Sequence, residues 1–392
     1  MEFIYIGLVL FLFFAVNYLF QRIHLPSLLG YIFLGIVLSA FLTENMDNVV
    51  NHVADIGIML LFFLLGLKYP LNHLLNISRR IWQVGTMDVV LNFGVSFLIA
   101  YLLFGFDLFA ALIIGGIAYA SSSSMTLRML EDTNRANTPE AEFKEGLLIF
   151  EDIVAPIMVS FLVGFGQAGS ISGGDIAAIA IRVLLLILVS IFIAIYGFRK
   201  LELFVNRYIS KDFILLFALA VAFTLAGSAV YLGLSKLLGI FLAGVILSET
   251  LASEELSSLI NPLKNVTLPF FFFWFGTSIS IDAGIIMPGF LLILIVWGLT
   301  AKLLVGFFGG RKYGLTRKGS LRAAFSLGQR GEFSVVIAVL ADPLLRVFCG
   351  IYILVTALVG VLLFHRAPAY SEKFYQNLKK LFPRWFTNGV SS

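Results

Sequence analysis

The chain has 392 residues, of which 60% are hydrophobic and only 13% charged, with a formal net charge of +4. Soluble domains usually carry about 25% charged residues, so this composition excludes an ordinary water-soluble fold. So small a positive charge indicates no nucleic-acid partner, and the single cysteine, Cys349, excludes an internal disulfide.

Apolar stretches follow one another along the whole chain. A membrane-spanning helix needs about 20 mostly apolar residues. The first stretch, in MEFIYIGLVLFLFFAVNYLF, lacks the basic lead and cleavage site of a secretory signal and is predicted to remain in the mature protein. The sequence therefore predicts an all-α integral membrane protein with about thirteen transmembrane helices: 3–20, 26–42, 50–67, 82–104, 108–127, 146–166, 177–198, 213–232, 234–249, 264–281, 285–308, 320–341 and 349–366.

Lysine and arginine are unevenly distributed over the predicted loops. Cytoplasmic loops of membrane proteins collect these residues. With the N-terminus outside, the segments assigned to the cytoplasm hold most of them, which predicts a multi-pass cell-membrane protein with a cytoplasmic C-terminus. The basic, aromatic tail, 367–392, is predicted to lie against membrane lipid, and docking of a separate cytoplasmic regulatory subunit is the alternative.

Two adjacent carboxylates, Glu151 and Asp152, stand inside the sixth predicted span. A charge at mid-bilayer costs a few kcal/mol at least, which marks such residues as functional candidates. Pro156 has no N–H, so the carbonyl of Asp152, four residues earlier, is left without its helical hydrogen bond. A carboxylate beside a free carbonyl suits a hard cation. We therefore predict Asp152 and Glu151 as cation- and proton-binding residues, with a purely structural pairing to a basic residue as the alternative.

Other charged and polar residues also fall within predicted spans. Lys302 is the evident basic partner for the two acids, and Arg330 and Glu332 are predicted to compensate each other's charge or that of nearby helix termini. Asp88 and Asn92, four residues apart, share a helix face and are predicted to form hydrogen bonds that support the site.

Two spans contain residues that predict an interruption of the helix. The fifth has four consecutive serines, Ser121, Ser122, Ser123 and Ser124, which are also candidates for completing cation coordination. The twelfth has Gly328, Gln329, Arg330, Gly331 and Glu332. Paired interrupted helices in two halves of a chain point to a transporter's binding site. Seven crossings separate the fourth to sixth spans from the eleventh to thirteenth, which predicts an inverted-topology repeat. Close helix packing is the alternative reading of the serines.

Several other activities lack support in the sequence. No GxxxxGK[ST], HExxH or GxSxG motif occurs, so neither ATP-driven pumping nor common hydrolase chemistry is indicated. We expect no enzyme activity, no cofactor and no metal beyond an alkali cation. A cation channel remains an alternative, although no TVGYG-like filter is present, and a membrane-embedded enzyme is a further one.

Four motifs resemble those of the monovalent cation:proton antiporters, in the branch of bacterial potassium-efflux and sodium/proton exchangers. They are RIHLPSLLGYIFLGIVLS, FEDIVAP, PFFFFWFGTSISI and GQRGEFSVVI, and they occur in the family's order over nearly the whole chain. One departure is Glu151, where relatives often have Gln, Asp or Asn. The resemblance implies antiport by alternating access, with proton and cation competing at Asp152 and K⁺ favoured over Na⁺ or NH₄⁺.

The resemblance also implies a division of the chain and a homodimer. Residues 1–80 and 212–282 would form the dimerisation scaffold, 81–168 and 283–366 the transporting core, 169–211 the linker and 367–392 the cytoplasmic tail.

Overall fold

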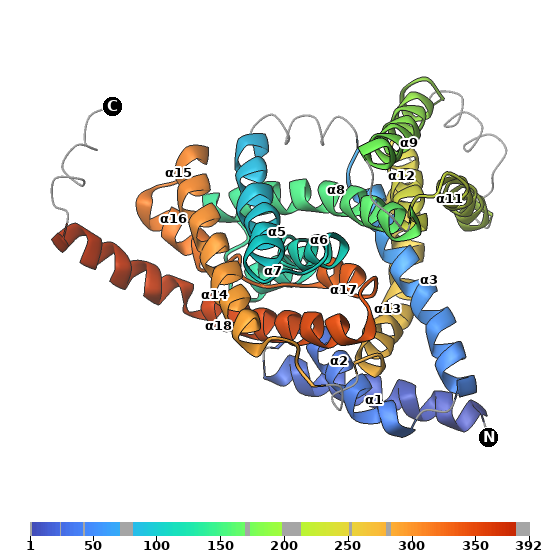
Figure 1. Ribbon diagram of the computed structural model, residues 1–392, viewed down its shortest axis with the longest axis horizontal. Helices are drawn as coiled ribbons and strands as arrows, with labels where there is room; N and C mark the ends of the chain where they lie inside the picture. The colour runs from blue at the N-terminus through green and yellow to red at the C-terminus, as the bar shows by residue number, and fades with distance from the viewer. Residues whose placement is uncertain are drawn as a thin grey trace. The chain divides into compact units, whose positions relative to one another are not determined.

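Helices make up nearly all of the computed structural model, which describes residues 2–23, 25–41, 44–70, 81–168, 173–197, 213–250, 253–279 and 284–381 (Figure 1). Within these residues, Ser121 and Arg330 form an isolated antiparallel β-bridge. The all-helical fold class predicted from the sequence is confirmed.

The chain divides into two compact units. Unit 1 comprises Met1–Asn76, Asp152–Gly284 and Val339–Val347, and unit 2 comprises Ile77–Glu151, Ile285–Ala338 and Phe348–Ser392. The helix α8 (Pro139–Ala168) belongs to both, because the division falls between Glu151 and Asp152. The scaffold and core boundaries given above remain a prediction, and residues 169–172 and 198–211 of the predicted linker lie outside the described residues.

Unit 1 is held together by close helix crossings. Its other helices are α1 (Glu2–Arg22), α2 (Ser27–Leu38), α3 (Glu44–Lys68), α9 (Gly173–Phe192), α11 (Ile214–Tyr231), α12 (Lys236–Ser248) and α13 (Ser253–Thr277). A Cβ placed on Gly66 of α3 would lie 2.1 Å from the Phe241 carbonyl oxygen of α12, and Gly276 of α13 meets Ile32 of α2 equally closely, at 2.2 Å. Glycine lets these backbones touch, which is the usual means of packing helices in membranes.

Unit 2 contains two stretches with the same order of elements. The first has a helix Ile81–Leu103, which includes α5 (Val95–Leu98) and π-helical turns, then α6 (Leu108–Ile117), α7 (Ser123–Asp132) and the start of α8. The second has α14 (Pro288–Leu304), a π-helical turn and α15 (Gly310–Tyr313), then α16 (Arg317–Ala324), α17 (Glu332–Ala338) and, from Phe348 on, α18 (Pro343–Leu381). A shared apolar core joins both stretches: Ile81, Val84, Phe143, Leu147, Val305, Leu315, Ala323 and Leu327.

Both predicted helix interruptions are present in unit 2. Residues 118–122 separate α6 from α7, and residues 325–331 separate α16 from α17. The two breaks lie side by side, because the Ser122 N–H donates to the Gln329 carbonyl over 2.9 Å beside the Ser121–Arg330 bridge. The antiparallel sense of this contact is that expected of halves with opposite topology.

The number of spans predicted from the sequence stays a prediction. In the described part of the chain, seven helices are long and apolar enough to cross a membrane: Asn48–Lys68, Ile81–Leu103, Pro139–Gln167, Gly174–Gly197, Ile214–Tyr231, Pro288–Tyr313 and Pro343–Asn377. Shorter apolar helices include Ile6–Arg22, Ser27–Leu38, Leu108–Ile117 and Lys236–Ser248. The helix α18 continues past the predicted end of the last span to Leu381, so the first part of the predicted tail is helical, whereas residues 382–392 lie outside the described residues.

Candidate functional site

A buried cluster of three charges lies in unit 2. The Lys302 Nζ donates to both Asp88 carboxylate oxygens, at 2.9 and 3.0 Å, and to Glu151 Oε1 at 3.0 Å. All three side chains are fully buried, so the ion pairs are not weakened by solvent. The structure thus brings Lys302 to Glu151, one of the two acids for which the sequence predicted it as a partner. It adds Asp88 as a second ion-pair partner, where the sequence indicated only supporting hydrogen bonds.

Asn92 and Arg330 extend this cluster. The Asn92 amide donates to Asp88 Oδ1 at 2.9 Å, and Arg330 Nη2 donates to Asn92 Oδ1 at 3.0 Å. The Arg330 guanidinium also reaches the Tyr119 carbonyl, at 3.3 Å, just past the end of α6. A cation at a helix C-terminus is favourable. Of the two roles predicted for Arg330, these contacts match the compensation of a helix terminus.

The serine run contacts two carboxylates. Ser122 Oγ and Ser124 Oγ each donate to Glu332 over 2.8 Å, and Ser122 Oγ also caps α7 by accepting from the Met125 N–H at 3.3 Å. Glu332 opens α17 and meets the start of α7, so one carboxylate serves two helix N-termini. Ser123 is buried in the first turn of α7.

Ser121 connects the first break to α8, the helix that carries Glu151 and Asp152 and is called the acid helix below. Its backbone N–H donates to Glu151 Oε2, and its hydroxyl lies 3.4 Å from Glu151 Oε1. The same hydroxyl donates to the Leu327 carbonyl in the second break, at 3.2 Å. Glu151 is therefore fixed by Lys302 and by the backbone of a helix break together.

Asp152 is fully buried in unit 1. Its Oδ2 accepts a hydrogen bond from the Tyr69 hydroxyl at 2.9 Å. Pro156 stands inside α8, so the Asp152 carbonyl has no helical N–H to accept from. The sequence did not indicate Tyr69 as a site residue. A tyrosine just past an apolar span is ordinary at the membrane interface, so its position carries no functional signal.

The two glycines of the second break lie close to neighbouring residues. A Cβ on Gly331 would lie 2.3 Å from the Ser122 Cβ, and one on Gly328 would lie 3.2 Å from Leu299.

The Gln329 side chain is fully buried, and neither its amide nitrogen nor its oxygen has a hydrogen-bond partner among the described residues. Such a group is favourable only where water or a bound ion reaches it.

The site consists of carboxylates, basic residues, hydroxyls and helix ends. Among the described residues, no group of three or more His, Cys, Asp or Glu side chains is placed to hold a metal ion. Buried carboxylates beside interrupted helices can bind and release monovalent cations and protons.

Residues 8–366 match the family described as "Sodium/hydrogen exchanger, transmembrane". The chain belongs to this family. It is 42% identical over 369 residues, 94% of either chain, to the ammonium/H⁺ antiporter subunit AmhT of Alkalihalophilus pseudofirmus. It is 28% identical over 363 residues to the K⁺/H⁺ antiporter subunit KhtU of Bacillus subtilis, covering 90% of this chain and 86% of the relative.

The fold is similar to that of a solved antiporter. The structure of the sodium proton antiporter MjNhaP1 from Methanocaldococcus jannaschii at pH 8 superposes with a TM-score of 0.73 at 17% identity, covering 95% of this chain and 99% of that one. The family predicted from the four sequence motifs, the monovalent cation:proton antiporters, is confirmed, and the chain is a cation/proton antiporter.

Proposed function

We propose that this antiporter exchanges NH₄⁺ and K⁺ for protons in preference to Na⁺. The support is the 42% identity to an ammonium/H⁺ antiporter subunit and the 28% identity to a K⁺/H⁺ antiporter subunit, both over nearly the whole chain. The proposal widens the preference for K⁺ drawn from the sequence to include NH₄⁺, which is also a monovalent cation.

The exchange takes place at Asp152. The observation that carries this assignment is a fully buried carboxylate one position after Glu151, on a helix whose Pro156 frees the Asp152 carbonyl. An unoccupied buried carboxylate is unfavourable in a low-dielectric setting, so Asp152 holds either a proton or a cation at every stage of transport. Because a proton and a cation cannot occupy Asp152 together, binding of one requires release of the other, and transport is an obligatory exchange. Coordination by Ser121–Ser124 remains part of this proposal.

Transport proceeds by alternating access, with the core helices moving relative to the dimerisation scaffold of a homodimer. The protein lies in the cell membrane with its N-terminus outside and its C-terminus in the cytoplasm. Both relatives above are named as antiporter subunits, which supports a separate regulatory subunit acting at the cytoplasmic end of α18.

Transport in proteoliposomes tests this function. A pH-sensitive dye reports the collapse of an imposed pH gradient on addition of NH₄⁺, K⁺ or Na⁺, and protein-free liposomes correct for passive NH₃ entry. We expect saturable, cation-dependent collapse with NH₄⁺ and K⁺ at lower concentration than with Na⁺. Asp152→Asn should abolish it, whereas Asp55→Asn, a half-exposed carboxylate paired with Lys236, should not. A Na⁺ preference, or exchange retained by Asp152→Asn, would contradict the proposal.

A further inference from the structure

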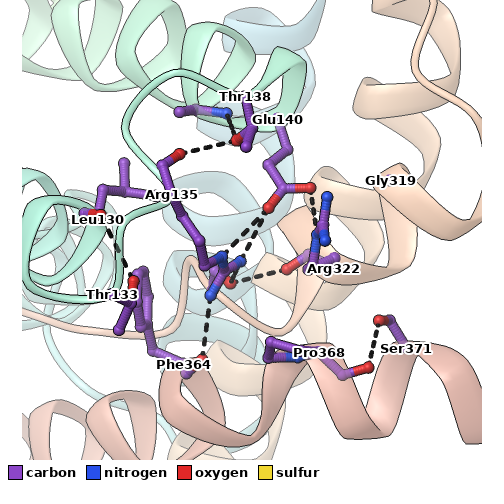
Figure 2. Close-up of polar contacts among 12 residues, drawn as sticks. Leu130, Thr133, Arg135, Thr138, Glu140, Gly319, Arg322, Phe364, Pro368 and Ser371 are labelled. Carbon is purple, nitrogen blue, oxygen red and sulfur yellow. Dashed lines mark hydrogen bonds and ion pairs between the residues drawn. The ribbon is translucent and has the colours of Figure 1, made fainter.

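A second buried ion cluster in unit 2 surrounds Glu140, in the first turn of α8 (Figure 2). Glu140 is 1% exposed, and both of its oxygens are engaged. Oε1 accepts from Arg135 Nε at 3.2 Å and Nη2 at 3.1 Å, and Oε2 accepts from Arg322 Nε. Glu140 precedes Glu151 by 11 residues, about 16 Å along an α-helix, so this cluster is separate from the Lys302 cluster.

The Arg135 guanidinium carries the cluster further. Nη2 also donates to Ser326 Oγ at 3.2 Å. Nη1 donates to the Phe364 carbonyl at 3.4 Å, as Figure 2 shows. The guanidinium carbon lies 4.8 Å from the centre of the Phe364 ring. Burial lowers the pKa of the Arg135 guanidinium, and the Glu140 carboxylate opposes this effect. Glu140 is therefore the group that keeps a buried positive charge stable here.

The segments joined by this cluster include parts of both interrupted helices and the start of α8. Arg135 follows α7, Glu140 begins the helix that carries Glu151 and Asp152, and Arg322 lies in α16. Ser326 belongs to the second helix break, and Phe364 belongs to α18. One carboxylate thus connects the ends of both interrupted helices to the acid helix.

We infer that Glu140 is a positioning residue for cation/proton exchange. Through Arg135 and Arg322, Glu140 holds the two interrupted helices in position relative to α8. The inference rests on the proposed role of α8 in exchange. A displacement of about 1 Å at a reacting group lowers rates by up to roughly a hundredfold, so loss of this arrangement should slow turnover. Glu140 lies too far along α8 to touch a cation at Asp152, so the affinity for the cation should change little.

The test compares Glu140→Gln with Glu145→Gln. The second variant removes the same charge five residues later on α8, at an exposed position. Turnover per folded, reconstituted molecule and the apparent KM for K⁺ are measured in proteoliposomes, and folded protein is quantified by size-exclusion chromatography. Glu140→Gln should lower turnover about tenfold or more with KM within about twofold of wild type, while Glu145→Gln matches wild type.

Two further measurements separate positioning from general stability. Hydrogen exchange should rise in residues 319–331 and 123–138 of Glu140→Gln and stay unchanged in unit 1. Arg322→Lys, which keeps the charge at a side chain one-third exposed, should retain more turnover than Arg322→Gln, and this pair provides the test if Glu140→Gln does not fold.

Two results would overturn the inference: reduced folded yield with normal turnover, or a rise in KM that matches the fall in turnover. Absence of exchange in wild type and Glu145→Gln would instead contradict the proposed function itself.

Discussion

At the scale of single residues, the central feature is a buried ammonium held by two carboxylates. Lys302 uses its donors on Asp88 and Glu151, and Asn92 supports Asp88. Removing one member of a buried ion pair leaves an uncompensated charge, which costs far more than the intact pair contributes. The three side chains therefore depend on one another.

Lys302→Gln should destabilise the protein by about 3–5 kcal/mol, because it leaves Asp88 and Glu151 as unpaired buried charges. The double variant Asp88→Asn/Lys302→Gln should recover a substantial part of that loss, since one of the unpaired charges is then absent. Thermal unfolding in detergent measures both effects.

The matched control is Lys236→Gln. Lys236 pairs with Asp55 in unit 1, but the two side chains are 40% and 50% exposed, so we expect a change of only about 0–1 kcal/mol. Equal destabilisation by the Lys236 and Lys302 variants, or no recovery in the double variant, would show that the cluster is not an interdependent unit.

At the scale of elements, helix ends created by the two breaks lie near side chains whose charge is opposite to that of the helix end. Arg330 lies against the carbonyl end of α6, and Glu332 lies against the N-terminal ends of α7 and α17. The fit depends on close approach, because Gly331 packs on Ser122 with no room for a Cβ.

Gly331→Ala should separate the two breaks and lower transport by roughly tenfold or more, since a methyl group would lie 2.3 Å from the Ser122 Cβ. Gly289→Ala provides the control, because a Cβ there meets nothing within 4 Å. Initial rates of K⁺-driven pH-gradient collapse, normalised to reconstituted protein, measure the effect. Wild-type rates in Gly331→Ala would show that contact between the breaks does not govern transport.

At the scale of the whole molecule, competition between proton and cation predicts a pH dependence of transport. Where the exchange site is mostly protonated, each fall of one pH unit should raise the apparent KM for K⁺ about tenfold and leave the maximum rate little changed, because protons occupy the cation's site. K⁺ is the suitable ion, since NH₃ crosses bilayers unaided. A KM that does not vary with pH would argue for separate proton and cation sites.

The sequence predicted much of this molecule because its strongest signals are local. Long apolar stretches identify spans, serines and glycines inside spans identify interrupted helices, and Glu151, Asp152 and Lys302 stand out as charges in apolar surroundings.

Pairing between distant residues was harder to predict. Nothing near Asp88 indicates that it pairs with Lys302, and Tyr69 and Glu140 lie at span ends, where polar residues are ordinary. Their roles depend on contacts across as many as 214 positions of the chain.

The most direct test of the central claim counts protons released when a cation binds. Purified protein in detergent and weak buffer is titrated with K⁺ at a pH where the exchange site is protonated, and proton release is recorded with a pH indicator. Wild type should release about one proton per bound K⁺, because Asp152 cannot hold both ions. Asp152→Asn should release none, whereas Asp55→Asn should match wild type. K⁺ binding without proton release in wild type, or equal release from Asp152→Asn, would contradict exchange at this carboxylate.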